Sequence, residues 1–221
     1  MRTPQDDLFP RSDRLRVLAL DVTSAESIRT IVATAGAIDV LVNNAGVGLL
    51  NPFEGIPMDV VRATFETNTF GAMALAQAFI PQFRERKAGL IINVSSTVTL
   101  KALPLLAAYT ASKAALNAFT ECLALELQPF NVRVSLVLPG RGPDTAFGKN
   151  AFAAMQKQGV TMPEAYADFA GHIMNEMRAY KGAVTTGDAV AEVIWRVANE
   201  PGSAMRQPAG SDAVALATSL V

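Results

Sequence analysis

At 221 residues, the chain is long enough to bury one sizeable hydrophobic core and short for two domains. Half of its residues are hydrophobic and 18% are charged, which excludes a disordered chain, and a net charge of -1 offers no basic surface for nucleic acid. One cysteine and one histidine exclude a disulfide framework and a typical zinc site, and no apolar run approaches the ~20 residues that span a bilayer. Residues 1–14 are polar and do not resemble a secretory signal, so we expect a globular cytoplasmic protein with no metal, nucleic-acid or membrane partner.

Four short apolar runs predict buried parallel strands. They are rich in Val, Ile and Leu, lack strict alternation and end in polar or turn-forming residues. The four runs cover residues 15–20, 38–43, 90–94 and 132–138.

Helical spacing separates these runs. Ser24 is the expected N-cap of a helix that ends near residue 34, and an apolar stripe predicts a long helix over residues 59–86. A third helix is expected over 105–126, and a fourth over 187–199. Residues 205–213 predict a last strand at an edge, because Pro208 cannot serve a central strand. Strands alternating with helices predict an α/β fold with a doubly wound parallel sheet, whose ligands bind beyond the carboxyl ends of the strands.

Between the third and fourth helices the pattern loosens. Residues 151–179 form an amphipathic region that carries Met and Phe side chains. We expect residues 141–186 to form a substrate loop or lid; an oligomer contact, or helices that simply cover the core, are the alternatives.

The pair Tyr109 and Lys113 carries the most chemical information. Residues four apart share a helix face, so the phenol and the ammonium can enter one cleft. A neighbouring cation favours the phenolate, so we expect a lowered pKa for Tyr109 and a group able to exchange a proton with an alcohol or carbonyl oxygen. An ordinary Tyr–Lys pair on an exposed helix face is the alternative.

Polar residues follow two of the predicted strands. Ser95 and Ser96 come directly after residues 90–94, and a hydroxyl there can donate to a substrate oxygen on which charge develops. Residues 43–46, with the sequence Asn-Asn-Ala-Gly, end another strand at the same rim of the sheet. Asn68 interrupts an apolar stripe, and a buried amide needs hydrogen-bond partners.

These motifs together resemble the short-chain dehydrogenase/reductase family. The resemblance runs from residue 15 to about residue 137, resumes near 206–213, and rests on an ordered set of short motifs. They are Leu-Asp-Val-Thr at 20–23, Asn-Asn-Ala-Gly at 43–46, Asn68 before Gly71, Val-Ser-Ser at 94–96, Tyr-Thr-Ala-Ser-Lys at 109–113, and Pro139-Gly140.

The resemblance implies a Rossmann-like fold and hydride transfer between NAD(P)(H) and a small carbonyl or alcohol substrate. It implies that Tyr109 is the general acid or base and Ser96 polarises the substrate oxygen, while Lys113 binds the nicotinamide ribose and Asn68 supports a proton relay. The implied cofactor contacts are Asp21, Asn44, Ala45, Gly46, Tyr109, Lys113, Pro139 and Gly140. Relatives commonly pair the helices that bear Asn68 and Tyr109, so a homodimer or homotetramer is expected.

The sequence departs from the family at two places. No glycine precedes Asp21, so the glycine-rich strand–turn–helix that holds the pyrophosphate is missing, and we expect residues 1–221 to form a single, N-terminally incomplete domain that binds the cofactor weakly or not at all. Without that unit, residues 38–43 become a sheet edge unless residues 15–20 pair with them. After Pro139-Gly140, the next threonine, Thr145, comes one residue later than usual, which puts its contact with the carboxamide in doubt. Arg2 slightly favours NADP over NAD.

Three functional interpretations remain open. The first is an oxidoreductase, shortened here by the gene model or as a fragment, and the second is a non-catalytic relative that serves as a binding or oligomerising module. The third, a serine hydrolase, is disfavoured because the chain has no Gly-x-Ser-x-Gly motif.

Overall fold

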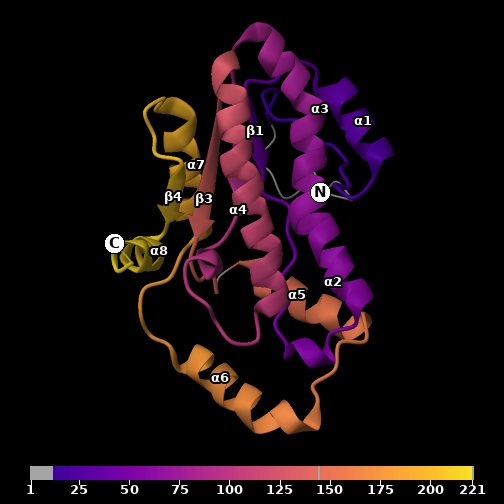
Figure 1. Cartoon of the computed structure of the whole chain (residues 1–221), viewed down its shortest axis with the longest axis vertical. Helices are drawn as coiled ribbons and strands as arrows, with labels where there is room; N and C mark the ends of the chain where they lie inside the picture. Colours follow the sequence, from indigo (N-terminus) through magenta and orange to yellow (C-terminus); the bar gives the residue numbers. More distant parts are fainter. Residues whose placement is uncertain (1–11, 144, 221) are drawn as a thin grey trace.

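The computed structural model describes residues 12–143 and 145–220, and within them four parallel strands form one sheet in the order β1-β2-β3-β4 (Figure 1). The strands are β1 Val40–Asn43, β2 Gly89–Val94, β3 Val132–Pro139 and β4 Arg206–Ala209. Leu41 pairs with Ile91, and Ile91 pairs with Val134, so these three side chains lie side by side on one face of the sheet. The expected α/β fold with a parallel sheet is therefore confirmed.

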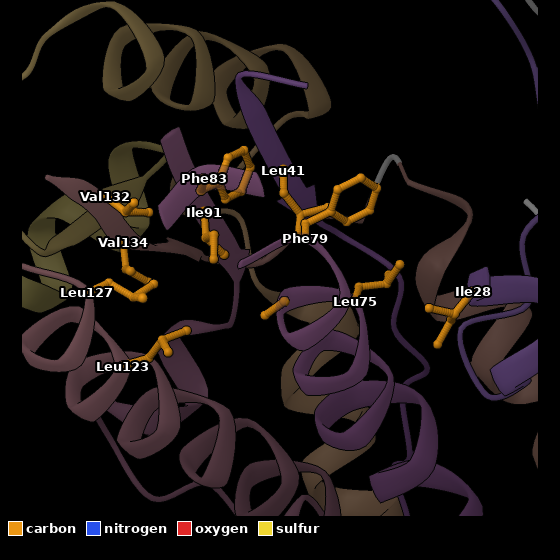
Figure 2. Close-up of a cluster of buried hydrophobic side chains, with 11 residues drawn as sticks. Ile28, Leu41, Leu75, Phe79, Phe83, Ile91, Leu123, Leu127, Val132 and Val134 are labelled. Carbon is orange, nitrogen blue, oxygen red and sulfur yellow. The ribbon is translucent and has the colours of Figure 1, made fainter. Parts of the chain in front are cut away.

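Two helices, α3 Gly71–Arg86 and α4 Ala107–Leu127, cover one face of the sheet, and α1 Ala25–Ala35 packs against α3. Figure 2 shows their contact with the strands, a cluster of buried apolar side chains in which Phe79 and Phe83 of α3 meet Leu41, Ile91 and Val134. Phe83 and Ile91 are fully buried, and burying a side chain of this size contributes about 1.5–3 kcal/mol. This cluster holds α3 and α4 against the strands and so fixes the residues at their carboxyl ends.

The opposite face is covered by α7 Gly187–Asn199, whose Val193 and Val197 pack on β2 and β3. This cover does not extend fully to β1, where Val42 is 38% exposed. After β4, Gly210 turns the chain with a φ of 101° into α8 Ser211–Thr218. The expected strand over residues 205–213 is therefore only half strand.

The predicted strand over residues 15–20 is wrong: the structure gives these residues no strand conformation and no place in the sheet. Leu20 and Val22 instead pack, half-buried, against the core cluster under α1 and α3. Burial of its side chains is enough to stabilise an apolar run, whereas a strand also needs a neighbouring strand whose backbone groups form hydrogen bonds with its own. Among the described residues, β1 is consequently an edge of the sheet, as expected if residues 15–20 do not pair with it.

The long helix predicted over residues 59–86 consists of three parts. They are α2 Met58–Phe65, a π-helical turn over Glu66–Phe70, and α3, which follow one another without a break. The helix predicted over 187–199 matches α7, and Ser24 caps α1 by accepting a hydrogen bond from the Ser27 amide at 3.2 Å.

Residues 141–186 contain two helices, α5 Ala146–Lys157 and α6 Ala167–Ala179. Figure 1 shows α5 beside α2, whereas α6 lies away from the sheet. No helix among the described residues is both long enough and apolar enough to cross a membrane.

Candidate active site

Tyr109 and Lys113 lie one turn apart on α4 and are both buried, with 7% and 4% of their surface exposed. The Lys113 ammonium donates to the carbonyl of Val94, at the end of β2, at 2.9 Å. α4 forms here because residues 107–118 are rich in Ala, the strongest helix former. The pair therefore faces the carboxyl end of the sheet and not solvent, which excludes the exposed surface pair considered as the alternative.

Burial moves the pKa values of these two groups in opposite directions. Burial raises the pKa of Tyr109 to about 12, and a hydrogen bond with the Ser96 side chain opposes this rise. Burial lowers the pKa of Lys113 to about 8. The lowered pKa expected for Tyr109 is therefore wrong for the chain by itself, because the loss of hydration outweighs the effect of Ser96.

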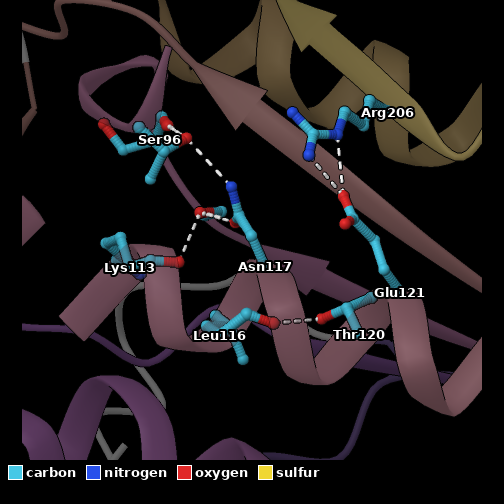
Figure 3. A network of polar contacts seen from close by, with 9 residues as sticks. Ser96, Lys113, Leu116, Asn117, Thr120, Glu121 and Arg206 are labelled. Atoms are coloured by element: carbon cyan, nitrogen blue, oxygen red, sulfur yellow. Dashed lines mark hydrogen bonds and ion pairs between the residues drawn. The ribbon is translucent and has the colours of Figure 1, made fainter. Parts of the chain in front are cut away.

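The two serines after β2 have different partners. Ser96 is 8% exposed, lies against the Tyr109 phenol and accepts a hydrogen bond from the Val98 amide at 3.3 Å. Ser95 instead donates to Asn117 of α4, which in turn donates to Thr99 at 2.9 Å (Figure 3). Ser95 thus fastens the loop to α4, and Ser96 contacts the tyrosine.

Asn68 lies in the π-helical turn and is 1% exposed. Its Oδ1 accepts from the Val47 amide at 2.7 Å, and its Nδ2 donates to the Val47 carbonyl at 2.9 Å and to the Ser112 hydroxyl at 3.0 Å. π-helical turns occur often at functional sites, because the extra residue re-aims a side chain out of the regular helix. Asn68 thereby connects the loop after β1 to the helix that bears Tyr109.

The loop after β1 passes close to this group. A methyl group at Gly46 would come 3.3 Å from Asn68 Oδ1 and 3.4 Å from Lys113 Nζ, so a glycine leaves open space beside both. Asn44 and Ala45 are exposed at the rim. Beneath them, Asn43 Nδ2 donates to Asn93 Oδ1 at 2.8 Å, which ties β1 to β2.

The other residues expected to contact the cofactor come from the end of β3 and from the segment before α1. Pro139 and Gly140 end β3 and are half-buried. Asp21 precedes α1, where its Oδ1 accepts from the Thr23 hydroxyl at 2.7 Å; the neighbouring Val22 packs against Gly71, three residues after Asn68. Thr145 donates to the Gly142 carbonyl at 2.8 Å, and Arg2 lies outside the described residues.

Phe147 of α5 is a residue of this site that the sequence did not predict. Its ring lies 5.9 Å from the Tyr109 ring, and the same helix buries Ala151 and Met155. The signal was present, because Phe147, Ala151 and Met155 follow one another at intervals of four and so share a helix face. The pattern does not reveal that this face packs against Tyr109.

Comparison with known proteins agrees with this arrangement. The family model of the short chain dehydrogenases matches residues 5–156. Bovine (Bos taurus) retinol dehydrogenase 8 is 44% identical over 128 residues, which are 57% of this chain and 41% of that protein. Human 17-beta-hydroxysteroid dehydrogenase type 1 is 32% identical over 87% of this chain and 59% of its own length. An uncharacterised oxidoreductase of Schizosaccharomyces pombe is 31% identical over 95% of this chain and 88% of its own length.

Solved structures agree as well. A short-chain dehydrogenase from Streptomyces avermitilis superposes with a TM-score of 0.76 at 32% identity, covering 94% of this chain and 75% of that one. A closed serine dehydrogenase complexed with NADP+ gives a TM-score of 0.74 at 27% identity, with 89% and 75% covered. NAD+-bound xylitol dehydrogenase gives a TM-score of 0.67 at 27% identity, with 87% and 77% covered.

The chain belongs to the short-chain dehydrogenase/reductase family, whose members are NAD(P)-dependent oxidoreductases. Its match to the retinol dehydrogenases covers less than half of their length.

Proposed function

We propose that this chain transfers a hydride between NAD(P)(H) and a carbonyl or alcohol substrate, with Tyr109 as the general acid or base. The observation that carries this proposal is the approach of the Ser96 side chain to the Tyr109 phenol, with both residues buried. Two hydroxyl groups can then reach one substrate oxygen, and a cation lies one helical turn away.

The residues present fit the nicotinamide-ribose half of the cofactor. The Lys113 ammonium has three donors, of which the Val94 carbonyl takes one, and open space lies beside it at Gly46. A ribose hydroxyl could accept a hydrogen bond from one of the remaining donors of the Lys113 ammonium. When bound, the cofactor supplies the hydride, and Asn44, Ala45, Pro139 and Gly140 would line it.

In the reducing direction, Tyr109 donates its proton to the carbonyl oxygen while Ser96 donates a hydrogen bond to the same oxygen. A pKa of about 12 keeps the phenol protonated at neutral pH, so it holds the proton to be given, but the transfer requires stabilisation of the phenolate that forms. Lys113 stabilises the phenolate that remains. Asn68 holds the backbone of Val47 and so fixes the loop that faces the cofactor; we assign the reprotonation of Tyr109 to water near this amide.

Residues 141–186 act as the substrate lid in this proposal. Phe147 and Met155 of α5 lie with Leu49 and Val160 around Tyr109, and this wall is apolar. It fits a hydrophobic carbonyl compound, which agrees with the retinol and hydroxysteroid substrates for which two relatives are named.

The test is Tyr109→Phe in the whole chain, assayed by the loss of NADPH absorbance with retinal, a steroid ketone and a long-chain aldehyde as probes. Removal of the acid should lower turnover by about 10²–10⁴-fold while NADPH binding stays within about threefold of wild type. Trp195→Phe, at an exposed aromatic residue of α7 outside residues 141–186, is the control and should keep wild-type turnover. Substantial turnover in Tyr109→Phe would remove this residue from the mechanism.

The oligomer is a second part of the proposal. α3 and α4 leave an apolar groove of about 520 Å³ lined by Phe70, Met73, Phe119 and Leu123, among others, and Phe70 is 50% exposed. We infer that a second copy of the chain covers this groove, giving a homodimer or homotetramer.

A further inference from the structure

A group of polar contacts outside the catalytic pocket joins three chain segments at the carboxyl end of β3. Thr185 Oγ1 accepts from the Gly140 amide at 3.0 Å, and its hydroxyl can donate to Asp212 Oδ1 at 2.6 Å or to the Ala209 carbonyl at 2.9 Å. Asp212 Oδ2 accepts from the Arg141 amide at 2.7 Å, and the Thr185 amide donates to the Arg141 carbonyl at 2.7 Å. We call Gly140, Arg141, Thr185 and Asp212 the strand-end cluster.

The strand-end cluster is built into the fold. Thr185 is 2% exposed, and Asp212 lies in the first turn of α8, where the helix dipole favours a carboxylate. Side chains at Gly140 and Gly210 would collide with Asp212 and Thr185 respectively, so both glycines allow these groups to reach the backbone. Two amides and one carbonyl of residues 140 and 141 are thereby held by side chain and backbone together.

The position of these contacts gives them a consequence for the cofactor. Pro139 and Gly140 are the end of β3 that the proposed function places against the nicotinamide. The Arg141 guanidinium continues from the same point to α6, where it stacks on the Tyr180 ring at 4.6 Å and donates to the Met177 carbonyl. Thr185 and Asp212 therefore hold the end of β3 and also the backbone of Arg141, whose side chain contacts the end of α6.

We propose that Asp212 and Thr185 are positioning residues, which act through the backbone of residues 140 and 141 to hold the strand end in the shape that binds the nicotinamide cofactor. This inference rests on the proposed function and deepens it. We expect the Asp212 carboxylate to hold this backbone more strongly than a neutral acceptor would, because hydrogen bonds to an ionised acceptor are about twice as strong as neutral ones.

The test compares Asp212→Asn, Thr185→Val and Thr185→Ser in the whole chain. Asp212→Asn and Thr185→Val should raise the KM for NADPH about tenfold, as expected for the loss of one charge-assisted or buried hydrogen bond. At saturating NADPH, kcat should stay within about threefold, because Tyr109 and Lys113 lie on α4, Ser96 lies after β2, and none of them is hydrogen-bonded to the cluster. Thr185→Ser keeps the hydroxyl and should restore the wild-type KM.

Two neighbouring residues give matched controls. Asp188→Asn removes an exposed carboxylate from the first turn of α7, and Thr186→Val removes the hydroxyl that caps α7 at 3.1 Å from the Ala189 amide. Both leave the strand-end cluster intact and should leave the KM for NADPH unchanged, even where Thr186→Val lowers stability. An unchanged KM in Asp212→Asn, or an equal rise in either control, would overturn the positioning role.

Amide hydrogen exchange separates this inference from the proposed function. In Asp212→Asn the amides of residues 140 and 141 should exchange at least about tenfold faster, with the amides of β2 unchanged, since their acceptors are weakened. Unchanged exchange would contradict the cluster whether or not the chain turns over a substrate. A wild-type chain without NADPH turnover would instead contradict the proposed function, and leave the cluster to be judged by exchange alone.

Discussion

At the scale of single residues, burial controls the protonation of the two groups that define the pocket. Tyr109 keeps its proton because its pKa rises to about 12, and Lys113 gives up its proton more readily because its pKa falls to about 8. Neither shift follows from the sequence, because the separation of four residues shows only that the groups share a helix face. Their burial depends on the elements that pack around α4.

Lys113 should make stability depend on pH in a defined window. Between about pH 8 and the unfolded value of 10.5, the unfolded chain binds the extra proton, so stability rises with pH; Tyr109 acts in the opposite sense only between 10 and 12. Lys113→Met removes the buried ammonium and with it this pH dependence. From pH 7 to pH 10, the unfolding free energy of wild type should therefore rise by about 2 kcal/mol relative to that of Lys113→Met. Urea unfolding at both pH values measures this difference. Lys101→Met, at an exposed lysine, is the control. A difference in unfolding free energy between wild type and Lys113→Met that does not change with pH would contradict the prediction.

At the scale of elements, α5 connects the lid region to the catalytic pocket through one aromatic contact. Phe147→Ala removes the ring that packs against Tyr109 and should loosen α5, so that trypsin cleaves after Lys149 and Lys157 several times faster. Phe152→Ala is the matched control, because this phenylalanine is on the same helix and is 57% exposed. Equal cleavage rates in the two variants would show that Phe147 does not hold α5.

Most elements could be predicted from the sequence, and the failures have physical causes. The helix over 187–199 has a strong apolar period and a capping threonine, which are local properties, and it matches α7. Residues 15–20 have the composition of a strand but not the neighbouring backbone that a strand needs. The π-helical turn at Asn68 could not be predicted from the spacing of the apolar residues either. One extra residue in a turn barely changes the apolar stripe along the helix.

At the scale of the whole molecule, the proposed oligomer depends on the groove between α3 and α4. Phe70→Glu places a charge in the apolar surface that a second copy would cover, so the protein should dissociate to the monomer in light scattering after size-exclusion chromatography. Leu125→Glu, at a position of α4 that is 71% exposed and outside the groove, should keep the wild-type mass. A monomeric wild-type protein would contradict the proposed assembly.

The cofactor should bind mainly through its nicotinamide half. In the proposed function Lys113, Asn68 and Gly46 would lie around that half, whereas the given sequence has no glycine-rich turn before Gly36 to hold a pyrophosphate. We therefore expect weak binding, with reduced nicotinamide mononucleotide and NADPH differing by less than about tenfold in Kd by calorimetry. A micromolar Kd for NADPH together with a far weaker mononucleotide would contradict this expectation. The same titration on an N-terminally extended chain measures what a phosphate-binding turn adds.

The candidate pocket was more predictable than the contacts that support it. Ser96 follows β2 at the edge of the sheet where ligands of such folds bind, and Tyr109 and Lys113 on α4 and Asn68 in the π-helical turn face the same edge. Phe147, Thr185 and Asp212 reach that edge from segments far along the chain, and their positions depend on how α5, α7 and α8 pack. Sequence spacing carries no information about such contacts.

The strand order of the sheet has a consequence for how the protein is made. Because β1, β2, β3 and β4 lie side by side in the order in which they are synthesised, each new strand docks on the outer edge of one already present. Among these four described strands none has to enter between two earlier ones, so this part of the sheet can grow on the ribosome as the chain emerges. The pocket is finished late in this sequence, when β4 and α8 bring Asp212 to the end of β3.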